Sequence, residues 1–455
     1  MDRRGFLAGG AALAQFAAFP AFADPDDLRT AAREAWLYGL PLIESARLRT
    51  AAIGPAPQEG TPGFNSFAHM RVPAGPGNRD MSAVEADVLY STAWIHLGGG
   101  PATISLPPTQ GRYVSLALFD LYGDVIAVVE GREAAKTGHE ITVIGPPSRV
   151  GVAGYTAPMP RMPELHKMVH TRGYWVWALA RVHLEGDHDL ASAQAVQGAL
   201  AVHVKPVKTP PRPVQPVGRD AAWNDYFYAA QQLIDENPPP PEDEAFFRRI
   251  APIQLGMYGG FEKARFADAE LGEITRGVGE AQTLVSSPPE GDQIGGAVYP
   301  KPNLGAFGQD FLYRAQTALT QPAAPPPQVV TALRLVGPDG ARTFLGNRRH
   351  RVLLTEPPPA AGFWSLTLYH AEPDGRLFLP QTGAGRASVG AWTPGLRRRE
   401  GPIEVTIGRG GPDSARGGAW LPAPDGAPFA LVLRAYAPGD DILKRRYRVP
   451  SVEAL

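Results

Sequence analysis

The sequence predicts a mainly β protein of the α+β class, in which two β regions are separated by a helical segment. Residues 64–205 and 329–455 contain β-rich runs divided by Gly or Pro turns, a spacing that suggests an antiparallel sandwich or barrel. Residues 220–320 instead carry apolar side chains at helical spacings. The 51 glycines and 48 prolines fit short strands joined by tight turns better than they fit a helical protein.

Residues 1–23 have the features of a signal peptide. Arg3 and Arg4 precede an apolar run from Phe6 to Phe19, which is shorter than the ~20 residues that a membrane span needs. Ala-Phe-Ala at residues 21–23 forms a cleavage site. A core helix at the start of the chain is the alternative, but this order of charge, apolar run and cleavage site favours a leader. The twin arginines resemble a Tat signal. We therefore expect the Tat export machinery as a partner, a periplasmic or secreted location, and no stable membrane span in the mature protein.

The mature chain is expected to begin with a helical segment at residues 24–63. Apolar residues at three- and four-residue spacings predict a helix over residues 25–50, interrupted at Pro41. The first β region is predicted to contain a series of strands and then a short helix over residues 191–202 that Asp189 caps. The predicted strands are Ala102–Leu106, Tyr113–Phe119, Val125–Val129, Glu140–Ile144 and Tyr174–Ala180.

Two proline-rich stretches divide the rest of the chain. Residues 206–219 form a linker that is expected to run extended, and residues 321–328 form a hinge. The helical segment between them has its patterns at residues 221–237, 242–254, 263–285 and 311–319. The strands predicted for the second β region are Val329–Leu335, His350–Thr355, Gly362–His370, Ile403–Ile407 and Phe429–Ala435.

Composition excludes several classes of function. With 44 basic and 45 acidic residues, the chain has no electrostatic footprint for nucleic acid or anionic lipid, so no nucleic-acid partner is expected. It has no cysteine, which excludes a catalytic thiol, a disulfide framework and thiolate metal sites. No feature of the sequence points to an oligomeric state.

Several stretches resemble a known pair of domains. EADVLYSTAW and GRYVSLALFDLYGDVIAVVEGRE resemble the DUF1254 pattern, whereas FLYRAQTAL, GFWSLTLYHAEPDG and AWLPAPDGAPFALVLRAYAP resemble DUF1214. Together these stretches cover about residues 36–205 and 300–450. The resemblance implies two jelly-roll-like β-sandwich domains with helices packed between and around them. It implies little about chemistry.

Some positions depart from the family pattern. Glu85 and Val88 stand where the first domain usually has Asn and Thr, and Ala419 replaces an Asn in the second domain. Ala387, after Arg386, and His350 each replace a Tyr. If a shared site uses these positions, the changes either alter that site or abolish it.

A polar constellation in the first β region provides the candidate catalytic and binding residues. Asp87 or Asp120 could act as a base and Tyr90 as an acid, with Arg112 or Arg132 holding an anionic group. The alternative is a buried Arg–Asp pair that fixes the strand order, with tyrosines capping the core. The full set is Asp87, Tyr90, Arg112, Tyr113, Asp120, Tyr122 and Arg132.

Aromatic residues of the second β region could line a stacking surface for a sugar or an apolar ligand. The candidates are Trp364, Tyr369, Trp392 and Trp420, with Arg386 as a further ligand-binding residue. Trp364 and Tyr369 are five apart in a predicted strand and therefore face opposite sides of its sheet. A core position is favoured for Trp364 and Trp420.

A metal site and other cofactor sites have little support. His166 and His170 would share one face of a helix, with Glu164 close by, and zinc would suit these ligands. A third ligand could come from His183 or from residues 187–189, but the chain has no HExxH motif. No cofactor is predicted.

Three functions remain open for this uncharacterised exported protein. The first is a cofactor-independent enzyme acting on a small molecule or cell-envelope component, for which a carboxylate with a shifted pKa in a cleft would be evidence. The second is a non-catalytic ligand-binding or envelope-interaction protein, which predicts an open aromatic surface with the acids paired to arginines. The third is a self-assembling structural protein, suggested by jelly-roll analogy.

Overall fold

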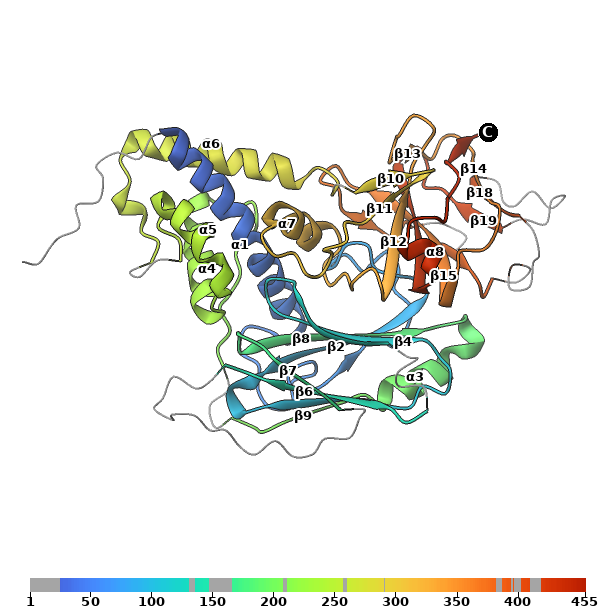
Figure 1. Cartoon of the computed structure of the whole chain (residues 1–455), viewed down its shortest axis with the longest axis horizontal. Coiled ribbons are helices and arrows are strands. Elements are labelled where there is room, and N and C mark those ends of the chain that lie inside the picture. Colours follow the sequence, from blue (N-terminus) through green and yellow to red (C-terminus); the bar gives the residue numbers. More distant parts are fainter. Residues whose placement is uncertain are drawn as a thin grey trace, which may run out of the picture.

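The computed structural model describes most of the chain and shows a mainly β protein of the α+β class, as predicted (Figure 1). The described residues are 25–130, 136–146, 166–207, 211–256, 260–289, 291–381, 387–393, 396, 402–409 and 419–455. The predicted leader, the candidates Arg132 and Arg386, and Glu164 lie outside the described residues.

The first sandwich consists of two sheets that pack face to face on an apolar core. One sheet has the order β1 (Ala68–His69), β2 (Val88–His96), β8 (Trp175–His183), β4 (Val114–Phe119) and β5 (Val125–Glu130). The other has the order β7 (His166–His170), β6 (His139–Ile144), β3 (Ala102–Leu106) and β9 (Ala201–Val204). Burial alternates along β3, because one face packs on the core and the other meets solvent. Every residue of β8 is buried, because both faces of its sheet are covered.

The second sandwich is also built from two sheets around its own apolar core. Its larger sheet has the order β10 (Asp292–Ile294), β11 (Ala297–Tyr299), β12 (Val330–Leu335), β20 (Pro428–Pro438), β15 (Ala360–Ala371) and β16 (Leu377–Phe378), with β13 (Phe344–Leu345) on β20 and β17 (Ser388–Gly390) on β15. The smaller sheet has the order β19 (Ala419–Pro422), β18 (Ile403–Gly408), β14 (His350–Leu354) and β21 (Glu453–Ala454).

Strand pairing in the two sandwiches is mostly antiparallel, but β6–β7 and β18–β19 pair in parallel. The jelly-roll order of the strands stays a prediction. Strands β10 and β11 lie within the segment for which the sequence predicts only helices. At three residues each, they are too short to show a strand periodicity.

The helices gather beside the sandwiches, around a long N-terminal helix (Figure 1). They are α1 (Pro25–Ile53), α4 (Trp223–Glu236), α5 (Glu244–Arg249), α6 (Asp268–Val285) and α7 (Phe311–Thr320), with α3 (Leu190–Gly198) on the first sandwich and α8 (Asp440–Leu443) on the second. Short 3-10 turns lie at η1 (Leu97–Gly99), η2 (Asp187–Asp189), η3 (Pro241–Asp243), η4 (Ala251–Ile253) and η5 (Lys263–Arg265). Helix α1 packs against α4, α6 and α7.

The predicted interruption of this helix at Pro41 is wrong, since α1 runs through the proline. Proline removes one backbone hydrogen bond from a helix. Here Leu40 and Leu42, on either side of it, are fully buried, so packing holds the helix together.

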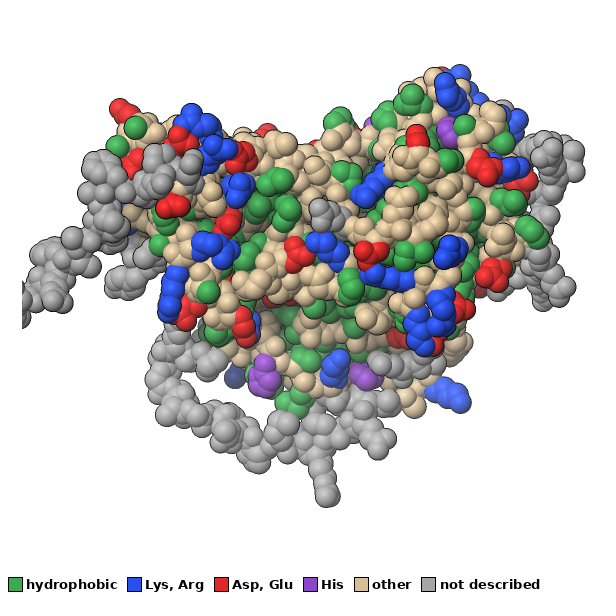
Figure 2. All heavy atoms as spheres, turned by 45° about the horizontal axis from the view of Figure 1, so that its top comes forward, with side chains coloured by type: hydrophobic (Ala, Val, Ile, Leu, Met, Phe, Trp, Pro, Cys, Tyr) green, Lys and Arg blue, Asp and Glu red, His purple; other side chains and the backbone are tan. Residues whose placement is uncertain are grey.

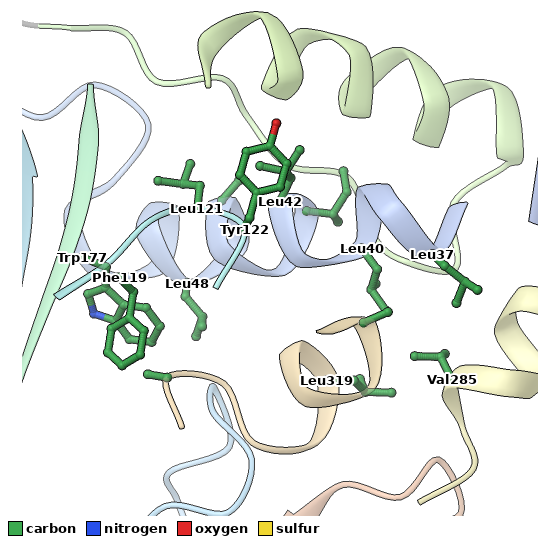
Figure 3. Close-up of a cluster of buried hydrophobic side chains, with 14 of the residues drawn as sticks. Leu37, Leu40, Leu42, Leu48, Phe119, Leu121, Tyr122, Trp177, Val285 and Leu319 are labelled. Atoms are coloured by element: carbon green, nitrogen blue, oxygen red, sulfur yellow. The ribbon is translucent and has the colours of Figure 1, made fainter. Parts of the chain in front are cut away.

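A third apolar core joins the helices to the facing sheets of the two sandwiches (Figure 3). Leu40 of α1 points toward Leu319 of α7, and Leu37 points toward Val285 of α6 (Figure 3). Leu48 lies nearer the first sandwich, where the same core includes Phe119 and Trp177 (Figure 3). This shared core fixes how the sandwiches sit relative to each other.

The contact between α1 and α6 requires a glycine. A Cβ atom at Gly277 would lie 2.2 Å from the carbonyl oxygen of Arg29 and 3.1 Å from the Cβ atom of Ala32. Real Cβ atoms do not approach a carbonyl oxygen so closely, so the two helices could not pack at this distance with alanine there.

On the surface, acidic and basic side chains are interspersed over the face seen in Figure 2. None of the helices in the described part of the chain combines the length and the apolar composition that crossing a membrane requires.

Candidate functional site

A hollow of about 770 Å³ lies where the first sandwich meets the second. The first sandwich contributes the loop that follows β3, the end of β8 and the exposed side of α3. The second sandwich contributes the start of β15 and the turn after β17. We call this hollow the cleft; its lining residues are Pro107, Pro108, Thr109, Gln110, Gly111, Arg112, Tyr113, His183, Glu185, Asp189, Ser192, Ala195, Val196, Ala199, Ala361, Gly362, Phe363, Ala391 and Trp392.

Aromatic rings from both sandwiches meet at the cleft. The imidazole of His183 stacks on the ring of Phe363, with centroids 3.7 Å apart. Trp392 stands at a steep angle beside this pair, 5.6 Å from His183 and 5.8 Å from Phe363. Tyr113 meets Phe363 edge-on at 5.6 Å. The cleft therefore has a continuous aromatic side that neither sandwich could form alone.

Two glycines make room for these rings. A Cβ atom at Gly362 would lie 2.6 Å from the ring of Tyr113, and one at Gly390 would lie 2.3 Å from the indole of Trp392. Both rings thus rest directly on the backbone of the second sandwich. Of these residues, Tyr113 and Trp392 are predicted from sequence, whereas Phe363 and the glycines are missed. The Gly immediately before the bulky strand residues that begin at Phe363 is the signal that could have indicated a close approach.

A bidentate ion pair forms the polar side of the cleft. Arg112 donates from Nη1 and Nη2 to the two carboxylate oxygens of Asp189, at 2.5 and 2.6 Å. The same nitrogens also donate to the carbonyl oxygen of His183 at 2.7 Å and to Oγ of Ser192 at 2.9 Å. These hydrogen bonds from Arg112 hold the pKa of Asp189 below its ordinary value. Arg112, predicted to hold an anionic ligand group, thus has internal partners.

The prediction that Asp189 caps a helix needs correction. Asp189 does occupy the residue before α3, but its side chain makes no capping hydrogen bond. Its carboxylate instead accepts hydrogen bonds from Arg112 and from the backbone N–H of Glu185, the latter at 3.0 Å. The helix also ends at Gly198, and the last residues of the predicted helical stretch begin β9.

Asp87 and Tyr90 lie outside the cleft, in a buried polar network between the two sandwiches. Arg181 of β8 donates to Oε1 of Glu85 at 3.2 Å, and Nε of Arg434 in β20 lies 3.9 Å from the same oxygen. Arg181 also donates to the carbonyl oxygen of Ala323 at 2.9 Å. Tyr90 accepts a hydrogen bond from the backbone N–H of Glu85 at 3.0 Å. Glu85, Tyr90, Arg181 and Arg434 border a small cavity of about 30 Å³.

The carboxylate of Asp87 is enclosed in this network, with the residue only 1% exposed. It accepts hydrogen bonds from the hydroxyl of Tyr436 at 3.2 Å and from Oγ of Ser388 at 3.4 Å. Burial raises the pKa of Asp87 to about 6, against the opposing effect of the Arg434 charge. Asp87 thus carries the shifted pKa expected of a catalytic carboxylate, but it does not line the cleft, where a base would be needed.

Asp120 and Tyr122 lie at a third place, where the first sandwich meets the helices. Asp120 accepts from the backbone N–H of Asp124 at 3.0 Å, and Tyr122 donates to the carbonyl oxygen of Asn237 at 2.8 Å. Nη1 of Arg314 in α7 lies 3.6 Å from the carboxylate of Asp124. Burial, together with the charge of Asp124, raises the pKa of Asp120. The structure therefore distributes the predicted constellation over three separate places.

The histidine pair does not lie on a helix. Residues His166–His170 form strand β7, paired in parallel with β6. Four residues along a strand span about 13 Å, so two histidines at this spacing cannot share one ion. The helix prediction fails because a four-residue spacing keeps two side chains on one face in a helix and in a strand alike. Among the described residues, no three or more His, Asp or Glu side chains are grouped to hold a metal ion.

Trp364 and Tyr369 face opposite sides of their sheet, as the sequence predicts. Trp364 packs in the core of the second sandwich, and Tyr369 packs in the core shared with the helices and the first sandwich. Both are buried and lie outside the cleft lining. The hydroxyl of Tyr369 accepts from Arg434 at 2.6 Å and donates to the carbonyl oxygen of Val84 at 2.8 Å. Trp420 is half-buried and donates to the carbonyl oxygen of Gly408 at 3.0 Å.

A second hollow of about 430 Å³ adjoins the cleft, and Trp392 lines both. We call it the side hollow. It is lined by Pro73, Ala74, Gly75, Pro76, Ala86, Leu184, Gly186, Asp187, Leu379, Pro380, Gln381, Ala387, Ser388 and Trp392. Ala387, one of the positions that depart from the family pattern, thus borders open space.

Fold and site together define a protein of two β-sandwiches, held by a helical cluster, with a cleft at their junction. Residues 64–204 match the family described as a protein of unknown function (DUF1254), and residues 330–440 match the one described as a protein of unknown function (DUF1214). The chain belongs to the family of proteins that carry these two domains.

A similar solved structure supports the fold. The crystal structure of the VPA0106 protein from Vibrio parahaemolyticus has a TM-score of 0.65 and 16% sequence identity, covering 94% of this chain and 100% of that chain. An uncharacterized protein from Burkholderia cenocepacia has a TM-score of 0.45 and 10% identity, with 94% of each chain covered. A comparison with curated proteins gave no match.

Proposed function

We propose that this protein is an exported, non-catalytic binding protein that holds a small amphipathic molecule in the cleft. The observation that carries the proposal is the contact of His183 and Phe363, which brings aromatic rings of both sandwiches together at one side of the cleft. A volume of about 770 Å³ falls within the ~300–1,000 Å³ typical of ligand pockets. Such pockets combine an aromatic side with a few polar groups, here Thr109, Gln110 and Ser192.

The pairing of the acidic side chains favours binding over catalysis. A general base must reach the proton that it removes, directly or through one water molecule. Asp189 is held by Arg112, and Glu85 is held by Arg181 within the buried network. Asp87 is nearly inaccessible. Acids paired to arginines are one part of the arrangement that the sequence predicts for a binding protein.

Export is the second part of the proposal, and it is supported by the twin-arginine leader pattern of the sequence. Replacing Arg3 and Arg4 by lysine tests it. The mature protein is expected in the periplasmic fraction for the natural leader, and the precursor in the cytoplasm for the double variant. Equal periplasmic amounts of both would contradict a twin-arginine route.

Binding is tested by screening purified protein against small amphipathic compounds for a rise in melting temperature, followed by calorimetry. The Trp392→Ala variant is expected to lose the ligand-induced shift, because it removes the ring that stands in the cleft. Trp420→Ala is the matched control, since it also removes a partly buried tryptophan but lies outside the cleft lining. Recovery of a chemically changed compound after incubation would contradict a non-catalytic role.

A cofactor-independent enzyme is the second candidate, and one observation favours it. Ser388 lines the side hollow and its Oγ lies 3.4 Å from Asp87, whose pKa is raised to about 6 by burial. A carboxylate with such a pKa could assist proton transfer through the serine hydroxyl. If this function holds, the Ser388→Ala variant loses turnover of the bound compound. The Trp392→Ala variant loses binding of the same compound.

A further inference from the structure

The cleft and the side hollow lie on either side of a single chain segment, residues 183–189. His183, Glu185 and Asp189 line the cleft, whereas Leu184, Gly186 and Asp187 line the side hollow. This segment, which we call the ridge, therefore separates the two hollows. Trp392 of the second sandwich borders both of them.

The indole of Trp392 is held in a fixed place. It lies at steep angles of 69° to His183 and 74° to Phe363, and its six-membered ring rests over Gly390. The side chain nevertheless remains partly exposed. A planar, partly exposed and pre-positioned ring at the junction of two hollows is suited to stack on a ligand that extends into both.

The polar groups around the ring indicate the chemistry of that ligand. Among the described residues that line the two hollows, Arg112 is the sole arginine or lysine, and it is paired with Asp189. Anionic ligands are therefore disfavoured. Exposed hydrogen-bonding side chains lie on both sides of the ridge, with Gln110 and Ser192 in the cleft and Asp187 and Gln381 in the side hollow. Such amides, hydroxyls and a carboxylate match a molecule with many hydroxyl groups.

We infer that the two hollows take one uncharged oligosaccharide, which crosses the ridge with a sugar ring stacked on Trp392. This inference rests on the proposed binding function and adds the class and length of the ligand. The two hollows together exceed the ~1,000 Å³ upper end for pockets that hold a single small ligand. A sugar ring has an apolar face for the indole and a rim of hydroxyls for the side chains around it.

The test is a length series, in which the full-length protein is titrated with N-acetylglucosamine oligomers of one to about six units. Tryptophan fluorescence and calorimetry measure the binding. Once one part of an oligomer is bound in the first hollow, its other sugar units reach the second hollow at a high effective concentration. The Kd is therefore expected to fall by about tenfold or more from the monomer to the longer oligomers. Glucose oligomers of the same lengths separate a general preference for sugar chains from one for the acetamido group. Length dependence with either series supports the inference.

Three variants test whether the length dependence arises from Trp392 and the side hollow. Trp392→Ala is expected to weaken binding of every oligomer by about tenfold or more, and Trp420→Ala to leave binding unchanged. Ala387→Trp fills the side hollow, so it should remove the gain from added units while leaving the shortest binding oligomer unaffected. Its melting temperature, measured alongside, establishes that the variant is folded.

The outcomes separate the inference from the proposed function. If small aromatic compounds raise the melting temperature and oligosaccharides of every length do not, the inference is overturned and the binding function stands. Binding without length dependence, or a length dependence that Ala387→Trp leaves intact, also overturns it. Binding of tetralysine but of no sugar would overturn it in favour of a cationic peptide. Absence of any stabilising compound contradicts the inference and the proposed function together.

Discussion

The imidazole of His183 lies almost parallel to the ring of Phe363, with their planes inclined by 19°. His183 ends strand β8 of the first sandwich, and Phe363 belongs to β15 of the second. On its other face, Phe363 stacks on Tyr436 with centroids 3.8 Å apart. One phenyl ring thus links the two sandwiches and borders the cleft.

Replacing Phe363 by alanine is expected to destabilise the fold and disrupt the cleft. Loss of a buried phenyl ring typically lowers the free energy of unfolding by about 3–5 kcal/mol, which urea denaturation would measure. Phe344→Ala is the control, because Phe344 is also a buried ring that contacts a histidine, His350, but lies within the second sandwich. It should cost similar stability and leave ligand binding unchanged. Equal effects of both variants on binding would contradict a special role for Phe363.

Helix α6 offers a pair of substitutions with opposite expected signs. Gly277→Ala should destabilise the protein by about 1–3 kcal/mol, because its methyl group would overlap the carbonyl oxygen of Arg29. Gly279→Ala, two residues later in the same helix, meets nothing within 4 Å. It should stabilise by about 0.5–1 kcal/mol, because alanine loses less backbone entropy on folding. Thermal and urea denaturation of both variants measure the contrast. Equal shifts would mean that α1 and α6 do not pack as described.

Asp87→Asn should change how stability depends on pH. The pKa of Asp87 is raised by burial from an ordinary 3.8 to about 6, so between about pH 4 and pH 6 the folded state binds more protons than the unfolded state. The free energy of unfolding of the natural protein therefore falls as pH rises through this window, relative to that of the Asn variant. The change should be on the order of 3 kcal/mol and level off above about pH 6. Urea denaturation at several pH values checks it, and a constant difference from pH 4 to pH 7 would be evidence against a buried charge.

Glu85→Gln should show how much the buried ion pair contributes to the free energy of unfolding. It would remove the carboxylate that pairs with Arg181 and lies beside Arg434, and breaking a buried ion pair in this way typically costs about 3–5 kcal/mol. Glu244→Gln is the control, because its pair with Arg248 is exposed on α5 and should contribute less than about 1 kcal/mol. Denaturant unfolding of the two variants gives the comparison. Similar small effects would indicate that water reaches the network.

Local sequence patterns were sufficient to predict much of the fold. The alternation of side chains along a strand depends only on near neighbours, which is why Trp364 and Tyr369 could be placed on opposite faces. The same reasoning failed for His166 and His170, because their spacing is compatible with a helix and with a strand. It also failed at Pro41, where burial among distant helices outweighs a local preference.

The candidate site could be predicted only in part, because its geometry depends on distant segments. Arg112, Tyr113 and Trp392 were identified by residue type and do line the cleft. The partners of Asp87 could not be found from sequence, since Tyr436 lies 349 residues further along the chain. The enclosure of Asp87 by Ser388 and Tyr436 was likewise decided only when the two sandwiches came together.

The position of α1 at the centre of the helical cluster has a consequence for how the protein is made. Arg29 of α1 contacts Glu280 of α6, which follows 251 residues later. At a synthesis rate of about 5–20 residues per second, α6 leaves the ribosome roughly 10–50 s after α1. During most of that interval the apolar side of α1 has none of its helical partners, since α4 is the first of them to follow, so it is available to chaperones. Helix α1 is therefore synthesised early but packed late, and folding can be completed only once most of the chain has been translated.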